Sequence, residues 1–220
     1  METSRDDSPV RRSDGEETHA AILRQAMALA SVEGLGGLTI GRLARTVGLS
    51  KSGVYAHFRS KRRLQMEVVE AARQVFVREV IEPGLSAPAG LGQLRGLCDA
   101  FLAYVRRGVF PGGCFFAGML GEFDARPGPL HREVTADQRE WLDLLHTTAE
   151  RARARREVDP GADLEQLAFE LHAALELANY LYVLHRDAAF LERGRAAVEA
   201  AIGRALPREA HEPGGASPDG

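Results

Sequence analysis

The chain has 220 residues, of which 45% are apolar, which is enough for one large or two small folded domains and argues against global disorder. No segment approaches the ~20 consecutive apolar residues of a membrane span, and residues 1–15 lack the apolar core of a secretory signal. We therefore expect a cytoplasmic protein with no membrane partner. The net charge of −3 gives no sign of a nucleic-acid ligand, yet the charges are unevenly distributed.

Apolar residues recur with a helical period along almost the whole chain, and strand-like alternation is nearly absent. We therefore predict an all-α fold of about nine helices between two disordered ends. Residues 1–15 form a polar arm, and residues 207–220 form a tail that is rich in Pro and Gly. The first helix covers residues 16–33, and glycines at positions 34, 36 and 37 end it.

Residues 39–58 (TIGRLARTVGLSKSGVYAHF) have the pattern of a helix-turn-helix. Thr39 caps a short helix to Thr46, Gly48 supplies the positive φ of a sharp turn, and Ser50 caps a second helix to about His57. A small residue is needed where the two helices cross, and an aliphatic residue of the second helix must pack onto the first helix. These roles go to Ala44 and Val54, and a miniature core is expected from Ile40, Leu43, Val47 and Leu49.

The same segment is strongly basic, because no acidic residue occurs between Glu33 and Glu67. A basic segment on a mildly acidic body is typical of a protein that touches phosphates with one end only. A solvated surface run is the alternative. The basic residues of the interval are Arg42, Arg45, Lys51, Arg59, Lys61, Arg62 and Arg63.

In a helix-turn-helix the start of the second helix meets base edges, while surrounding groups hold phosphates. A packed Tyr55 and a solvated His57 are the alternatives for those two residues, and Phe58 is expected in the core. We assign base contacts to Lys51, Ser52 and Gly53, beside the cap Ser50, and phosphate contacts to Thr39, Tyr55, His57 and Lys61, with Arg45 and Arg62 as weaker candidates.

Six further helices are predicted in the remaining two-thirds of the chain. Asp163 and Gln166 resemble a capping box, and the helix that they open is apolar almost all round, so it must be buried on most sides. The expected helices cover residues 60–82, capped by Ser60 and ended by Pro83 and Gly84, then 91–107, 114–123, 130–157, 164–185 and 188–205.

Residues 38–64 (LTIGRLARTVGLSKSGVYAHFRSKRRL) resemble the DNA-binding domain of TetR-type transcriptional regulators, most distinctively from Ser50 to Lys61. Gly41 and the pair Arg62-Arg63 depart from what is common in that family. The resemblance covers about the first third of the chain. It implies a DNA-binding domain at residues 16–62 and a ligand-binding and dimerisation domain at 63–206. The implied protein is a repressor that binds a near-palindromic operator in double-stranded DNA as a homodimer and is released by a small effector.

The C-terminal helices fit subunit pairing, with an internal bundle core as the alternative. The last helix offers small residues for an interface, namely Ala196, Ala197, Ala200 and Ala201. The effector pocket is expected among aromatic, Met and polar residues of the body, although such residues at helical spacing are more often core. The candidates are Phe101, Tyr104, Phe115, Phe116, Met119, Trp141, His146, Phe169, His172, Asn179 and Tyr180.

Three other functions are alternatives to this one. A transcriptional activator shares all of these residues, whereas a ligand-independent architectural DNA protein would not need the long acidic body. An enzyme is not supported, because the chain has no Gly-rich phosphate loop, Gly-x-Ser-x-Gly or His-Glu-x-x-His motif. No metal or cofactor is expected. Cys98 and Cys114 lack metal-ligand spacing and are expected to be reduced core residues, with a redox switch as the alternative.

Overall fold

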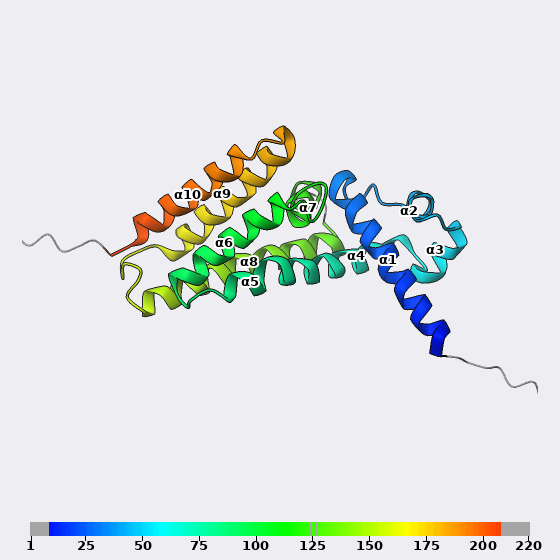
Figure 1. Cartoon of the computed structure of the whole chain (residues 1–220), viewed down its shortest axis with the longest axis horizontal. Coiled ribbons are helices and arrows are strands. Elements are labelled where there is room, and N and C mark those ends of the chain that lie inside the picture. Colours follow the sequence, from blue (N-terminus) through cyan, green and yellow to red (C-terminus); the bar gives the residue numbers. More distant parts are fainter. Residues whose placement is uncertain (1–8, 124, 126, 208–220) are drawn as a thin grey trace, which may run out of the picture.

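The computed structural model describes residues 9–123, 125 and 127–207. These residues form α-helices and one π-helical turn, with no strand among them (Figure 1). The described part has nine continuous helical segments, as predicted, because the helix that begins at residue 61 continues without a break through the π-helical turn to residue 85. The elements are α1 (Pro9–Glu33), α2 (Ile40–Val47), α3 (Lys51–Phe58), α4 (Lys61–Phe76), η1 (Val77–Ile81), α5 (Glu82–Leu85), α6 (Leu91–Arg106), α7 (Phe115–Phe123), α8 (Pro129–Ala154), α9 (Leu164–His185) and α10 (Ala189–Ala205).

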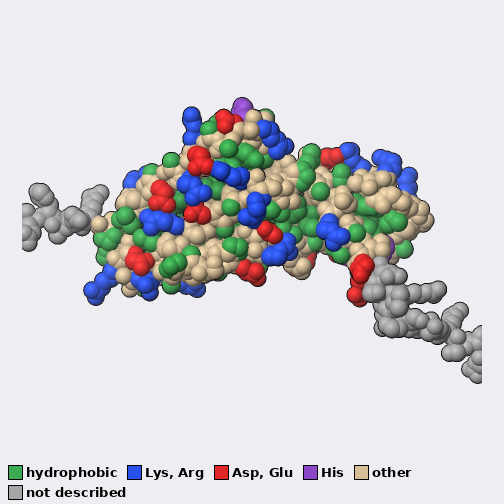
Figure 2. All heavy atoms as spheres, in the orientation of Figure 1, with side chains coloured by type: hydrophobic (Ala, Val, Ile, Leu, Met, Phe, Trp, Pro, Cys, Tyr) green, Lys and Arg blue, Asp and Glu red, His purple; other side chains and the backbone are tan. Residues whose placement is uncertain are grey.

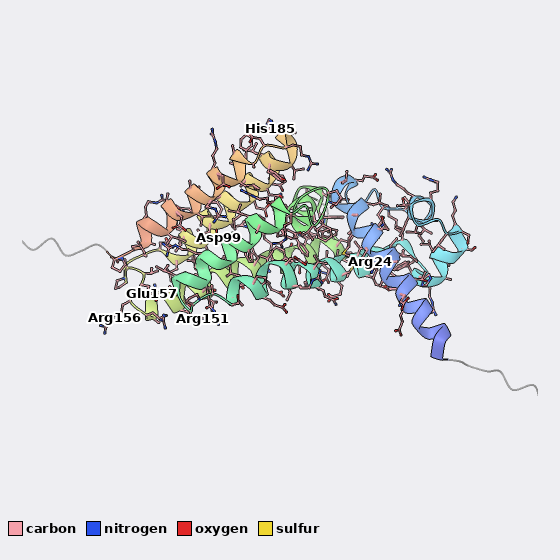
Figure 3. All side chains as sticks on the ribbon, viewed as in Figure 1. Arg24, Asp99, Arg151, Arg156, Glu157 and His185 are labelled. Atoms are coloured by element: carbon pink, nitrogen blue, oxygen red, sulfur yellow. The ribbon has the colours of Figure 1, made fainter. Side chains whose placement is uncertain are left out.

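The molecule is elongated, with α1 to α3 at one end and a larger helical body at the other (Figure 1). Helix α4 runs from the small end into the body, where α6, α8 and α9 pack together. Helices α9 and α10 form a hairpin along one side of the body, and His185 marks its tip (Figure 3). None of the helices in the described residues is both long and apolar enough to span a membrane.

Side-chain caps begin four of the helices where the sequence predicts them. The hydroxyl groups of Thr39, Ser50 and Ser60 accept hydrogen bonds from backbone N–H groups of the first turns of α2, α3 and α4, at 3.2, 3.0 and 3.1 Å. Asp163 caps α9 by accepting from the Gln166 N–H at 3.0 Å. The capping box is only half formed, because the Gln166 side chain donates to Glu170 instead of returning to the cap.

Two helix boundaries differ from the predictions at prolines. Helix α1 begins at Pro9, so residues 9–15 are helical and do not belong to a disordered arm as predicted, whereas residues 1–8 lie outside the described part. Proline fits a first helical turn because its missing N–H would have no partner there. The helix from residue 60 continues past Pro83 to Leu85. In η1 the Glu82 N–H reaches back five residues to the Val77 carbonyl, which places Pro83 in the first turn of α5.

Helix α8 ends at Ala154, three residues before the predicted end, because Arg156 takes a left-handed φ of 62°. Glu157 therefore leaves the helix, and its carboxylate accepts from the Leu91 N–H at 2.8 Å, at the start of α6. Arg151, Arg156 and Glu157 lie together at the far end of the body (Figure 3). Of the predicted tail, Pro207 is described and exposed, and residues 208–220 lie outside the described part.

Both cysteines are buried and free, as predicted for core residues. Burial raises the pKa of each thiol, Cys98 and Cys114, to about 12. Since the thiolate is the reactive form of cysteine, this environment does not favour the redox alternative.

Candidate functional site

Helices α2 and α3 cross as a helix-turn-helix requires. Ala44 and Val54 are buried at the crossing, and Gly48 between the helices has a φ of 68°, in the left-handed region that glycine adopts at little cost. Phe58 is fully buried, as predicted. The prediction for Leu49 is wrong, because this side chain is 39% exposed after the turn instead of joining the miniature core.

An open groove runs between α2 and α3 on the outer side of this end. Arg45, Lys51 and Tyr55 line it, and Tyr55 is 54% exposed, so the alternative of a packed tyrosine is wrong. Arg42 is a groove residue that the sequence analysis did not select, although it belongs to the basic interval. The full lining is Thr39, Ile40, Gly41, Arg42, Arg45, Lys51, Ser52, Tyr55 and Ala56.

The remaining predicted DNA contacts lie around this groove. The Ser50 hydroxyl caps α3 and lies 3.0 Å from the Ser52 hydroxyl. Gly53 is half-buried, and a Cβ there would meet the Ser50 oxygen at 3.2 Å. Lys61 is exposed and donates to the Gly36 carbonyl at 2.7 Å. His57 is half-buried, with its ring 5.7 Å from that of His19, so it is not the fully solvated residue of the alternative.

The basic charge of this end is largely uncompensated. Arg42 pairs with Glu33, and Arg63 pairs with Glu67 at 2.7 Å. Within the residues that the structure describes, no carboxylate pairs with the exposed side chains of Arg45, Lys51 and Arg62. Lys and Arg side chains gather along the upper edge of this end in Figure 2. Such a surface attracts phosphates, as the charge pattern predicts.

A second hollow lies inside the body, with a volume of about 330 Å³. Four aromatic rings contribute to its walls: the Phe76 and Trp141 rings meet edge to face at 5.3 Å, the Phe101 ring stacks on Trp141 at 6.4 Å, and Phe116 is the fourth. Four of the predicted pocket residues line it, namely Phe101, Phe116, Trp141 and His172. The other lining residues are Arg73, Phe76, Val77, Ile81, Cys114, Leu120, Val134, Asp137, Gln138, Glu140, Leu144 and Glu176.

Polar groups of this cavity are incompletely hydrogen-bonded. Arg73 donates to one oxygen of Asp137 at 2.7 Å, and Gln138 contacts the His172 Nε2 atom at 2.7 Å. Because the amide of Gln138 donates there, the proton of a neutral His172 lies on Nδ1. Four buried polar atoms have no partner among the described residues, and all belong to the lining: Asp137 Oδ2, Trp141 Nε1, His172 Nδ1 and Glu176 Oε2. Since buried polar groups are nearly always paired, this concentration makes the cavity the candidate ligand site of the body.

Burial also shifts the ionisation of the polar lining. It raises the pKa of Glu176 to about 7 and lowers that of His172. It raises the pKa of Asp137 as well, although the Arg73 guanidinium acts in the opposite direction. The charged form of each group is therefore poorly solvated by the protein.

The remaining predicted pocket residues do not line this cavity. Phe169 is 61% exposed, because its side of α9 faces away from the body, and the expectation that it lines the pocket is not met. Asn179 is buried and accepts from the Cys114 N–H at 2.9 Å, which ties α9 to the start of α7. Tyr180 is 45% exposed, and its hydroxyl donates to the Ala117 carbonyl of α7 at 2.7 Å. Core packing accounts for Tyr104, Phe115 and Met119, and His146 is half-buried on α8 outside the lining.

The four charged members of the lining, Arg73, Asp137, Glu140 and Glu176, were not among the predicted pocket residues. One signal was available for Glu176, which stands four residues after His172 and therefore shares its face of α9. A carboxylate at that position of an otherwise apolar helix is as informative as the histidine. No comparable signal marked Arg73 and Asp137, which lie on helices with many charged residues.

Helix α7 connects the cavity with the small end. Phe116 and Leu120 of α7 line the cavity, and Glu122 of the same helix binds the loop after α1. The two carboxylate oxygens of Glu122 accept from the N–H groups of Leu35 and Gly36 at 2.7 and 2.5 Å. A movement of α7 would therefore act directly on the loop between α1 and α2.

The exposed side of α9 is largely apolar, whereas α10 also exposes the charged residues Glu192, Arg193, Glu199 and Arg204. Phe169, Leu177, Tyr180 and Leu184 of α9 are exposed, at spacings that place them along one side of the helix. Three of the predicted small residues of α10, Ala196, Ala197 and Ala200, are also exposed. Ala201 is buried and faces the body, so it does not belong to this surface.

Comparisons with known proteins agree with this architecture. A family model described as bacterial regulatory proteins of the tetR family matches residues 22–68, and a tetracyclin repressor-like C-terminal domain matches residues 90–198. No curated protein matches the chain. A TetR transcriptional regulator from Chloroflexus aurantiacus is 29% identical with a TM-score of 0.80, and the match covers 88% of this chain and 98% of that one.

Two further solved structures contain ligands. A protein from Saccharomonospora viridis in complex with choline is 19% identical, with a TM-score of 0.70 over 88% of this chain and 100% of that one. AibR in complex with isovaleryl coenzyme A and operator DNA is 18% identical, with a TM-score of 0.65 over 86% of this chain and 98% of that one. With both of its domains matched and the fold shared, the chain belongs to the TetR family of transcriptional regulators.

Proposed function

We propose that this chain is a repressor that binds a near-palindromic operator as a homodimer and dissociates when a small effector enters the cavity of the body. One observation carries the proposal. The small end has a basic groove whose charge is largely uncompensated, the body has a cavity with unpaired polar groups, and the short helix α7 connects the two ends. Residues 16–62 serve as the DNA-binding domain and residues 63–206 as the ligand-binding and dimerisation domain. Neither a catalytic reaction nor a cofactor is part of this proposal.

The groove between α2 and α3 is the proposed DNA surface. Lys51, Ser52 and Gly53 open α3, and their small or extended side chains leave room for base edges in the major groove. The groups around them are suited to phosphates and set the register. These are Thr39, Tyr55, His57 and Lys61, the weaker candidates Arg45 and Arg62, and Ser50, which holds the helix start.

The outer face of the α9–α10 hairpin is the proposed subunit interface. Large exposed apolar residues gathered on one face favour association, and a two-fold axis would bring the same face of a second copy against it. Two recognition helices held about 34–36 Å apart can then read successive half-sites. A monomer would present only one short helix to the DNA.

The cavity is the proposed effector site, with Phe101, Phe116, Trp141 and His172 among its contacts. Its volume of about 330 Å³ is at the small end of the usual range for ligand sites, roughly 300–1,000 Å³. Similar folds are known with choline and with isovaleryl coenzyme A, so the fold accepts chemically different ligands. A ligand that shifts α7 would pull on Leu35 and Gly36 through Glu122.

The test uses the purified chain and the DNA upstream of its own gene. Fluorescence anisotropy at several salt concentrations should show tight binding that weakens steeply with salt, and footprinting should show one protected near-palindrome. Sedimentation should give a dimer. Binding without salt dependence would reject the basic groove as the DNA surface, and protection without a preferred site would favour the architectural alternative. Transcription in vitro from that promoter separates a repressor from an activator.

A further inference from the structure

The geometry points to an organic amine as the effector, with its protonated nitrogen against Glu176 and its apolar body among the rings of Phe76, Phe101 and Trp141. This inference rests on the proposed function, because it assumes that the effector binds in the cavity of the body. It names the chemical class that the cavity selects, which the fold alone leaves open.

The first argument is the balance of charge. Among the described residues of the lining, Arg73 is the only Lys or Arg, and it is already paired with Asp137 and with Glu133, at 2.7 and 3.3 Å. Glu176, whose Oε2 atom is buried, is left without a basic partner there, whereas Glu140 of the same lining is exposed to solvent. An anionic ligand would meet the unpaired Glu176 carboxylate in a poorly solvated space, where repulsion is strong, and a cation would be attracted.

The second argument is the state of the Glu176 carboxylate. Its Oε2 atom is buried and has no hydrogen-bond partner among the described residues, and Asp137 Oδ2 is in the same condition. Both atoms are acceptors, so each requires an N–H or O–H donor. An ammonium group supplies N–H donors together with the positive charge, which a neutral alcohol does not. Pairing of this kind offsets the cost of keeping a carboxylate out of water.

The third argument is the aromatic wall. Phe76, Phe101, Phe116 and Trp141 surround the cavity, with contacts between ring centroids of 5.3 to 6.4 Å. Aromatic faces attract cations and also cover the apolar body of a ligand. Two donors have no hydrogen-bond partner among the described residues, namely Trp141 Nε1 and His172 Nδ1. They could bind an acceptor on the ligand, such as a hydroxyl or carbonyl oxygen.

The volume limits the size of the ligand. At ~30 Å³ for each molecule of liquid water, a cavity of about 330 Å³ has room for roughly a dozen non-hydrogen atoms. A phenyl ring joined to an amine by a short alkyl chain is of this size.

The experiment compares three probes that share one body and differ in charge: 4-phenylbutylamine, 4-phenylbutanol and 4-phenylbutyrate. Trp141 is the single tryptophan of the chain and lines the cavity, so its fluorescence reports occupancy directly. At about pH 8 the amine is cationic and Glu176 is ionised. We expect the amine to bind at least roughly tenfold more tightly than either analogue. Absence of amine binding, or equal binding of the alcohol or the carboxylate, would overturn the inference.

A substitution assigns the selectivity to Glu176. Glu176→Gln keeps the shape and removes the charge, so the amine should lose roughly tenfold or more in affinity while the alcohol is unaffected. Glu165→Gln, an exposed carboxylate on the same helix, is the matched control and should leave both affinities unchanged. A folded Glu176→Gln chain that retains the amine affinity would overturn the assignment. Should this variant not fold, the comparison of probes on the unmodified chain decides alone.

These measurements need no DNA, so they separate the effector class from the regulatory role. A chain that binds its operator with the expected salt dependence but prefers the alcohol or the carboxylate is a regulator with a different class of effector. A chain that selects the amine but does not bind DNA has the proposed cavity chemistry without the proposed function.

Discussion

At the small end of the molecule, the residues assigned to DNA are mostly exposed and lie within one stretch of 24 positions, from Thr39 to Arg62. In the body, all residues around the cavity except Glu140 are buried or half-buried, and they come from α4, η1, α6, α7, α8, α9 and the residue before α7. The first arrangement is built by local rules of capping and turns, and the second by packing between distant helices. The two ends should therefore respond differently to substitution.

The largest expected effect contrasts two glycines, Gly84 in the body and Gly48 in the turn. A Cβ on Gly84 would lie 2.6 Å from the Leu97 Cα atom, and backbone cannot move aside easily. Gly84→Ala should lower the free energy of unfolding by about 3 kcal/mol. A Cβ on Gly48 meets nothing within 4 Å, so Gly48→Ala costs only the left-handed conformation, about 1 kcal/mol.

Thermal unfolding followed by circular dichroism measures both costs, and anisotropy measures DNA binding. Gly84→Ala should reduce the stability of the body, whereas Gly48→Ala should affect DNA binding more than the overall melting temperature. Equal effects of the two substitutions on melting would contradict the idea that space is the constraint at one glycine and backbone conformation at the other.

Glu176→Gln should change how stability depends on pH. The pKa of Glu176 is about 7 in the folded chain, above the ordinary value of 4.5, so the unfolded chain releases its proton first as the pH rises. The folded state therefore loses up to about 3 kcal/mol between pH 4.5 and 7. The variant lacks this loss, so it should be more stable than the unmodified chain above pH 7 and similar to it near pH 4.

Urea unfolding at a series of pH values provides the measurement. The lowered pKa of His172 acts in the opposite direction, because it costs stability as the pH falls, but both proteins share it. The difference between the two chains therefore isolates Glu176. A difference that does not change with pH would mean that this carboxylate is ionised normally in the folded state.

The same contrast explains how far the sequence could predict the molecule. The caps Thr39, Ser50 and Ser60 and the turn at Gly48 depend on neighbours within a few residues, so they are readable in the sequence. The inward side of α9 depends on where α8 and α10 pack. For this reason the sequence does not distinguish His172, which lines the cavity, from Phe169, one turn earlier, which is 61% exposed.

Glu122→Gln tests whether the two ends communicate through α7. The amide can no longer accept from both Leu35 and Gly36, and hydrogen bonds to a charged group contribute about 1.5–3 kcal/mol each when well shielded. We expect operator affinity and effector affinity to change little on their own. The effector should still weaken DNA binding, but by a factor that is roughly fivefold or more smaller than in the unmodified chain. A change of this size lies within the usual range of coupling between two sites.

Anisotropy titrations of operator DNA with and without a saturating effector give this factor, and Glu165→Gln serves as a control that leaves α7 intact. Unchanged coupling in the Glu122→Gln variant would mean that α7 does not transmit the effect of the ligand to the DNA-binding end. Helix α4, which also lines the cavity and packs on α1, would then be the candidate.

The smallest expected effect is at Lys61, whose side chain is exposed and bound to the Gly36 carbonyl at 2.7 Å. Lys61→Ala should weaken binding to all DNA sequences about equally, because a phosphate contact carries no base information. It should also reduce the slope of log affinity against log salt concentration by about one. Arg151→Ala is the control, since Arg151 lies at the opposite end of the body (Figure 3). A slope that stays the same, or a loss confined to the operator sequence, would assign Lys61 to holding the α1–α2 loop instead of the DNA backbone.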